Sequence, residues 1–142
     1  MKKLIHILSL ALGLLLALAP FILFPVCELM PGGNPMRCWY SALLIQGLGS
    51  AIGILSLMGL WRRLSSVVHV AVAVAALMCW LVPHQIVRVD GWPFGLCGNP
   101  EHACRAVTMP AVGLLVAAVV TLSVLGLILN FVKGAPSRAT TR

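Results

Sequence analysis

Four long apolar stretches without a single charged residue dominate this sequence. An α-helix needs about 20 mostly apolar residues to cross the hydrocarbon core of a bilayer, which is about 30 Å thick. Inside hydrocarbon every backbone polar group must be bonded within the protein, and long runs without a two-residue alternation favour helices over barrel strands. The sequence therefore predicts an all-α protein, a four-helix transmembrane bundle forming a single membrane domain over residues 1–142. The predicted spans cover about residues 4–24, 40–60, 67–87 and 109–131.

The composition favours a membrane protein and argues against a soluble enzyme. Of the 142 residues, 61% are hydrophobic and 9% are charged, whereas a soluble domain has about 45–50% apolar and about 25% charged residues. The sequence contains no phosphate-binding loop, nucleophile elbow, zinc-protease helix or dinucleotide-binding fingerprint. We therefore expect a non-enzymatic protein that needs no cofactor.

The charged residues predict the orientation of the chain in the membrane. Most basic residues lie on one side of the predicted spans: Lys2, Lys3, Arg62, Arg63, Lys133, Arg138 and Arg142. The other side carries equal numbers of basic and acidic residues: Arg37, Arg88, Arg105, Glu28, Asp90 and Glu101. The positive-inside rule then places both termini and the tail 132–142 in the cytoplasm, with the loops 25–39 and 88–108 outside, as in a bacterial inner membrane. The net charge of +7 serves orientation and lipid contact in this interpretation, so nucleic acid is not an expected partner.

The two outward loops repeat one motif. Each loop has an aromatic residue three positions before a cysteine, then Asn-Pro, then a second cysteine close to the next span. The residues are Phe24-Pro25-Val26-Cys27, Asn34-Pro35 and Cys38 in the first loop, and Phe94-Gly95-Leu96-Cys97, Asn99-Pro100 and Cys104 in the second. The repeat predicts two tandem helical hairpins that arose by duplication, as in other membrane proteins with parallel repeats.

The four loop cysteines predict two disulfides. Thiols outside the cytoplasm are usually oxidised in pairs, and four cysteines allow three pairings. The simplest pairing, Cys27 with Cys38 and Cys97 with Cys104, closes each loop on itself. Each bridge adds about 2–3 kcal/mol for loops of this length.

Two other functions of the same loops stay open. A quinone-linked thiol oxidase would also have four spans and outward cysteine pairs, and Arg37 and Arg105 each adjoin a cysteine. However, neither pair has the Cys-x-x-Cys spacing that favours thiol exchange. Alternatively, Met30, Met36 and His102 together with the cysteines offer soft ligands for copper(I) or a similar metal.

Small residues at four-residue spacing mark candidate faces for helix packing. Gly49 and Gly53 form one such pair in the second span, and Gly113 and Ala117 form another in the fourth. This spacing lets helix backbones approach closely in lipid, either within the bundle or against a partner. His6 lies at the cytoplasmic end of the first span, and His69 lies about one turn into the third span, where we expect it to reach the interface.

These loops resemble the family of small four-span membrane proteins grouped as domain of unknown function 4418. The matching residues are Pro25-Val26-Cys27, Met36-Arg37-Cys38-Trp39-Tyr40, Gly47-Leu48-Gly49, Cys97, His102-Ala103-Cys104 and Thr108-Met109-Pro110-Ala111. The chain departs from the family pattern at Trp39 and Arg105, which stand where the family has histidines, and at Gln46, which stands where it has a glutamate. These departures weaken a metal or redox function.

The resemblance also implies a role, because genes of this family lie near those of ABC-type exporters. We therefore expect an accessory or structural subunit of a larger membrane complex. The expected partners are membrane lipids and other transmembrane subunits, such as the permease and ATPase of an ABC transporter.

Overall fold

A computed structural model describes residues 2–23, 36–61, 65–84, 91, 93–96, 101 and 103–134 of the chain. The elements in chain order are helix α1 (Lys2–Leu18), π-helix η1 (Ala19–Leu23), α2 (Arg37–Trp61), α3 (Ser65–Leu81), π-helix η2 (Cys104–Thr108) and α4 (Met109–Gly134). The described residues contain no β-strand. The predicted all-α, four-helix bundle is therefore confirmed.

Three of the helical stretches are long and apolar enough to cross a membrane. They are Lys3–Leu23, Arg37–Trp61 and Cys104–Val132. Helix α3 has 17 residues and is about 25 Å long at 1.5 Å per residue, which is shorter than a typical hydrocarbon core. It ends at Leu81, six residues before the predicted end of the third span at 87.

Pro83 explains why α3 ends early. A proline lacks the backbone N–H that continues a helix, and it disfavours helical backbone angles at the residue before it, here Val82. The missing N–H is the one that would bond the Cys79 carbonyl four residues earlier, whereas the Trp80 carbonyl accepts from both the Nδ1–H of His84 at 2.8 Å and its backbone N–H at 3.4 Å. Residues 85–87 of the predicted span lie outside the described residues.

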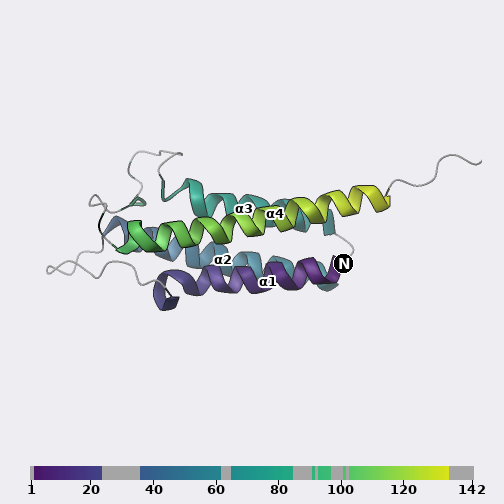
Figure 1. Ribbon diagram of the computed structural model, residues 1–142, viewed down its shortest axis with the longest axis horizontal. Helices are drawn as coiled ribbons and strands as arrows, with labels where there is room; N and C mark the ends of the chain where they lie inside the picture. The colour runs from purple at the N-terminus through teal and green to yellow at the C-terminus, as the bar shows by residue number, and fades with distance from the viewer. Residues whose placement is uncertain are drawn as a thin grey trace, which may run out of the picture.

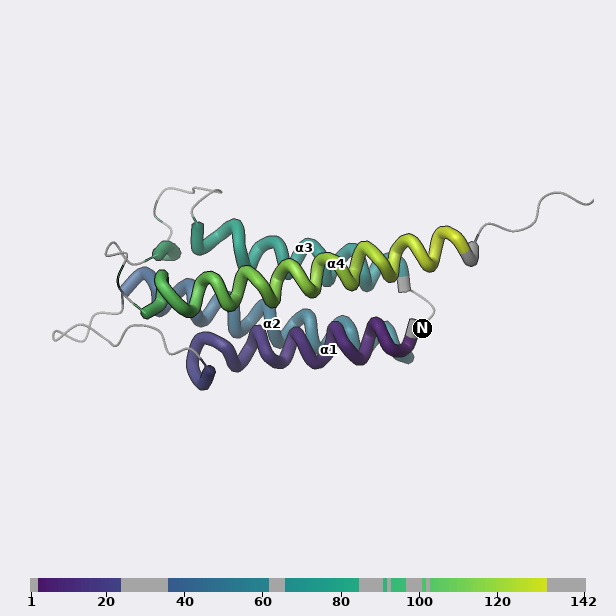
Figure 2. The backbone as a smooth tube through the Cα atoms, viewed as in Figure 1, coloured from purple at the N-terminus to yellow at the C-terminus, as the bar shows by residue number. Residues whose placement is uncertain are grey.

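The four helices run along the long axis of the molecule (Figure 1). Helix α1 packs against α2 and α4, and α3 also packs against α2 and α4. Helices α1 and α3 therefore lie on one diagonal of the bundle, with α2 and α4 on the other. We call the end where α1 and α3 finish and α2 and α4 begin the loop end, and the opposite end the terminal end. Figure 2 shows that the N-terminus and the last residues of α4 both lie at the terminal end.

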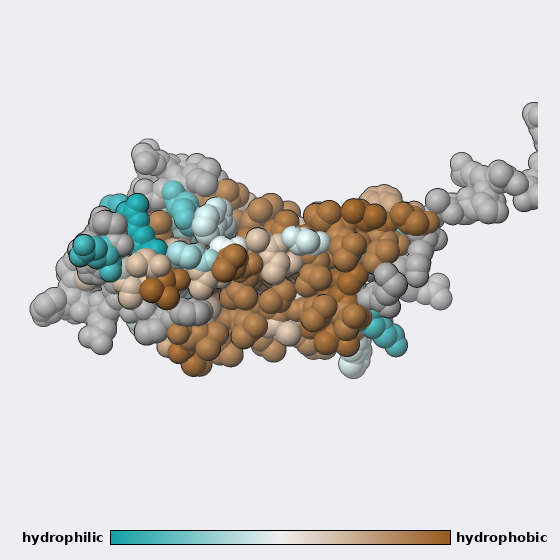
Figure 3. Space-filling view, viewed as in Figure 1, coloured by the Kyte–Doolittle hydropathy of each residue, from teal (hydrophilic) through white to brown (hydrophobic). Residues whose placement is uncertain are grey.

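The outer surface of the bundle is apolar. Large side chains such as Ile22, Leu114 and Phe131 are 69%, 75% and 74% exposed, which would be unfavourable in water and is favourable against lipid. Apolar residues cover most of the face shown in Figure 3, and most visible hydrophilic residues gather at the loop end. The chain is a membrane protein by these criteria.

The buried positions of the first hairpin recur in the second. Every buried position of α1 and η1 except Ala17 has a buried counterpart 63 residues later, and every buried position of α2 except Gly53 has one 66 or 67 residues later. The first set of pairs is Ile5–Val68, His6–His69, Ser9–Val72, Gly13–Ala76, Leu16–Cys79, Ala19–Val82 and Pro20–Pro83. The second set is Cys38–Cys104, Ser41–Thr108, Ala42–Met109, Ile45–Val112, Gly49–Val116, Ile52–Val119, Ser56–Ser123 and Gly59–Gly126.

In the second set the distance along the chain between counterparts changes by one residue, and the π-helix η2 accounts for this change. Cys104 follows Cys38 by 66 residues, whereas Thr108 follows Ser41 by 67. A π-turn holds one residue more than an α-turn, so the extra residue of the second hairpin is taken up within η2. The duplication that the loop motifs predict therefore extends through the helices.

Candidate functional site: an apolar groove between α3 and α4

One hydroxyl joins the two hairpins at the loop end. The Ser41 hydroxyl on α2 donates to the Gly95 carbonyl at 3.0 Å and accepts from the Gly95 N–H at 3.0 Å. Ser41 is completely buried, and Leu96 beside Gly95 packs against the core. This pair of bonds fixes residues 93–96 of the second loop against the first turn of α2.

The predicted disulfide cysteines that the structure describes are buried. Cys38 is 1% exposed and Cys104 is 0% exposed. Their predicted partners, Cys27 and Cys97, lie outside the described residues, so both pairings stay predictions. A cysteine that exchanges with another protein needs solvent access, and the burial of Cys38 disfavours that function. Cys79, in the middle of the bundle, is also fully buried.

The structure describes one of the three residues singled out as extra metal ligands. Met36 precedes α2 and is partly buried, whereas Met30 and His102 lie outside the described residues. Within the described ranges, no three His, Cys, Asp or Glu side chains come together as a metal site requires.

The three departures from the family pattern lie at the surface or at its edge. Trp39 meets Phe21 of η1 edge to face, with ring centroids 5.3 Å apart, so it packs α2 against η1. Arg105 and Gln46 are exposed.

The first pair of small residues lies between α1 and α2. A methyl group added to Gly49 would lie 2.6 Å from the Ala17 backbone nitrogen and 3.0 Å from the Gly13 carbonyl oxygen. One added to Gly53 would meet Leu10 at an ordinary 3.6 Å. The backbones of α1 and α2 therefore approach closely at Gly49, inside the bundle.

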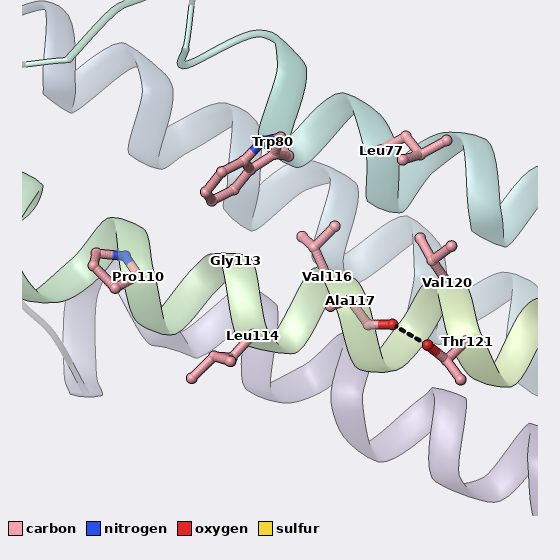
Figure 4. A pocket seen from close by; sticks show the side chains of 9 residues that line it. All are labelled: Leu77, Trp80, Pro110, Gly113, Leu114, Val116, Ala117, Val120 and Thr121. Atoms are coloured by element: carbon pink, nitrogen blue, oxygen red, sulfur yellow. Dashed lines mark hydrogen bonds between the residues drawn. The ribbon is translucent and has the colours of Figure 1, made fainter.

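The second pair lines an open groove between α3 and α4. A methyl group on Gly113 would lie 2.5 Å from the Trp80 ring, while Ala117 is exposed. The groove has a volume of about 680 Å³ and an almost wholly apolar lining. Figure 4 shows Val116 and Val120 pointing from α4 toward α3, with Trp80 at the loop end of the groove. The lining residues are Leu77, Trp80, Pro110, Gly113, Leu114, Val116, Ala117, Val120 and Thr121.

Substitutions between the two repeats account for the different packing of the two hairpins. The contact between α1 and α2 uses small residues, and their counterparts in the second hairpin are larger. The counterpart pairs are Gly13–Ala76, Ala17–Trp80, Gly49–Val116 and Gly53–Val120. Trp80, Val116 and Val120 are bulkier than their counterparts in the first hairpin, and all three line the groove between α3 and α4.

A family model described as "Domain of unknown function (DUF4418)" matches residues 9–129. The chain belongs to this family. No curated protein and no solved structure matches it. The segment that matches the family includes both cysteine loops and every residue that lines the groove.

The interpretation of His69 as a residue that reaches the membrane interface is wrong, because His6 and His69 pair inside the bundle. They are 3% and 2% exposed, and their rings stack in the bundle interior with centroids 4.7 Å apart and planes 5° apart. The His6 ring lies over Gly59 of α2, where an added methyl group would come within 2.5 Å, and the His69 ring lies over Gly126 of α4 in the same way. Distance from the helix end does not determine which way a side chain points. A histidine near the start of each hairpin and a glycine near its end recur in both hairpins, as His6 with Gly59 and His69 with Gly126, and this recurrence is the sequence signal that identifies the pair.

Proposed function

We propose that this DUF4418 protein is an accessory subunit of a larger membrane complex and that the groove between α3 and α4 receives a transmembrane helix of its partner. The observation that supports this proposal is the open groove itself, in which Gly113 and Ala117 stand one turn apart along α4. Small residues at this spacing allow a second backbone to approach, which drives helix association in lipid by packing.

The chemistry of the lining favours a helix over a polar ligand. A small-molecule site needs a few polar groups that fix the orientation of its ligand. Thr121, which supplies the one hydroxyl of the lining, already donates it to the Ala117 carbonyl at 2.8 Å. An apolar helix surface needs no such group. The family resemblance points to the permease of an ABC-type exporter, together with its ATPase, as the partner.

Filling the groove should release the partner. We expect Ala117→Phe to reduce the amount of permease and ATPase that co-purifies with the tagged protein at least tenfold, because the phenyl ring occupies the space of the incoming helix. The matched control is Ile54→Phe on α2, since Ile54 is 61% exposed and lies outside the groove. Quantitative mass spectrometry of native-membrane preparations measures the ratio. Equal recovery of the permease and ATPase with both variants would contradict the proposal. So would an unsubstituted protein that purifies without either partner.

We also propose that both termini lie in the cytoplasm of a bacterium and that the loop end carries two disulfides, Cys27–Cys38 and Cys97–Cys104. Two observations support this topology. The N-terminus and the end of α4 lie at the same end of the bundle (Figure 1), and Cys38 and Cys104 begin α2 and η2 at the opposite end.

Alkylation of the denatured, unreduced protein should therefore modify one cysteine, Cys79. After reduction the mass shift should correspond to all five. Cys79→Ala serves as the control and should abolish the shift before reduction. Labelling of two or more loop cysteines without reductant would show that the loops are not closed by disulfides.

A further inference from the structure

A second polar layer lies next to the stacked histidines. Ser9, Ser56 and Ser123 come from α1, α2 and α4, and each is at most 1% exposed. Each lies one helical turn from His6, Gly59 or Gly126, on the side of the loop end. The fourth position of this layer is Val72, the counterpart of Ser9 in the duplicated hairpin. Three hydroxyls therefore gather in the core just beyond the two imidazole rings.

Among the residues that the structure describes, none gives these three hydroxyls a hydrogen bond. Buried hydroxyls in proteins are nearly always bonded, and those without a protein partner commonly bond an ordered water. Three hydroxyls on different helices, close to two imidazoles, provide the several polar contacts that an interior water needs. By contrast, Ser50 and Thr121 lie on the outer surface and donate to carbonyls of their own helices.

We propose that these two layers form an internal proton-binding site, in which water held by Ser9, Ser56 and Ser123 hydrogen-bonds to the His6–His69 pair and the pair binds one proton. Imidazole is the side chain that changes charge near neutral pH. Two charged rings with centroids 4.7 Å apart repel each other strongly in a low-dielectric interior, so binding of the first proton opposes the second.

The proposed site uses water to stabilise the bound proton, because the four helices contribute no carboxylate to it. No Asp or Glu occurs in α1, α2, α3 or α4. Lys3 of α1 is exposed, one turn before His6. The other basic residues in the neighbouring sequence are Lys2, Arg62, Arg63 and Lys133. In this proposal dipoles of water and hydroxyl groups help to stabilise the bound proton, which reaches the site from the terminal end of the bundle because that end is nearer.

Histidine-selective ¹⁵N NMR of the full-length protein in lipid nanodiscs tests this site. Between pH 8 and pH 4 we expect the His6 and His69 signals to move together through a first step of one proton. The second step should lie at least about 1 pH unit lower, and in His6→Gln the remaining His69 should titrate in a single step. Independent, equal titration of the two rings would overturn the proposal. The absence of any titration across this range would also overturn it.

Serine variants distinguish a hydrated layer from a dry one, because the two cases predict opposite changes in the melting temperature. If water bonds these hydroxyls, Ser56→Ala and Ser123→Ala should each lower the melting temperature and shift the first histidine step by a few tenths of a pH unit. The matched control, Ser50→Ala, should leave the histidine titration unchanged. In a dry layer, removing an unsatisfied hydroxyl stabilises the protein. A higher melting temperature with an unchanged histidine titration in both core variants would therefore contradict the proposal.

Discussion

Gly49→Ala should destabilise the bundle by about 1–3 kcal/mol, the usual cost of overpacking a tightly packed core. The new methyl group would lie 2.6 Å from the Ala17 nitrogen and 3.0 Å from the Ala17 Cα. Both atoms belong to the backbone of α1, so a side-chain rotation cannot relieve the contact and the helices must separate. Unfolding in mixed micelles with increasing dodecyl sulfate measures the loss.

Gly47 is the matched control for this change. It lies two residues away on the same helix, and an added methyl group would meet no atom within 4 Å. Alanine has the higher helix propensity, so Gly47→Ala should leave the stability unchanged or raise it slightly. Equal losses for both variants would mean that α1 does not pack against α2 at Gly49.

Ile52→Ala should cost about 2 kcal/mol, the lower end of the range for truncating a buried isoleucine. Ile52 is completely buried in the core between the hairpins. In a soluble protein, part of this cost is the lost transfer of apolar groups from water into the core. That part is small here because lipid is as apolar as the core. The cavity left by the truncation still costs packing energy. The same unfolding measurement, performed at several protein concentrations, gives the difference in free energy.

Ile54→Ala provides the comparison within the same helix. Ile54 is 61% exposed to the surroundings of the bundle, so its truncation leaves no cavity and should cost less than half as much as Ile52→Ala. A larger loss at Ile54 than at Ile52 would mean that α2 is rotated relative to the described packing.

Much of the architecture could be predicted from the sequence because hydrocarbon restricts the choice of structure. The uncharged stretches predicted the helices, and the loop motifs predicted the duplication that the buried positions repeat. The end of α3 was placed too late because hydropathy alone ignores Pro83 and its effect on Val82. A count of apolar residues predicts the length of a span more reliably than it predicts the residue at which the helix ends.

The sites were harder to predict because they depend on which helix faces which. His6 and His69 are 63 positions apart, and their stacking follows from the diagonal placement of α1 and α3. The groove depends on Trp80 and Gly113, whose contact joins two helices. Gly113 and Ala117 have the same spacing as Gly49 and Gly53, yet one pair lines a groove and the other lies against α1. The sequence pattern marks both pairs alike, and only the neighbouring helices distinguish their roles.

The most direct test of a partner helix in the groove is photocrosslinking in native membranes. A photoreactive residue at Leu114, which is 75% exposed and lines the groove, should form a discrete adduct with one membrane subunit. Peptide mapping should place that adduct within a transmembrane helix of the partner, and the same probe at Ile54 should give no such product. Adducts with lipid alone at Leu114, indistinguishable from those at Ile54, would contradict the account.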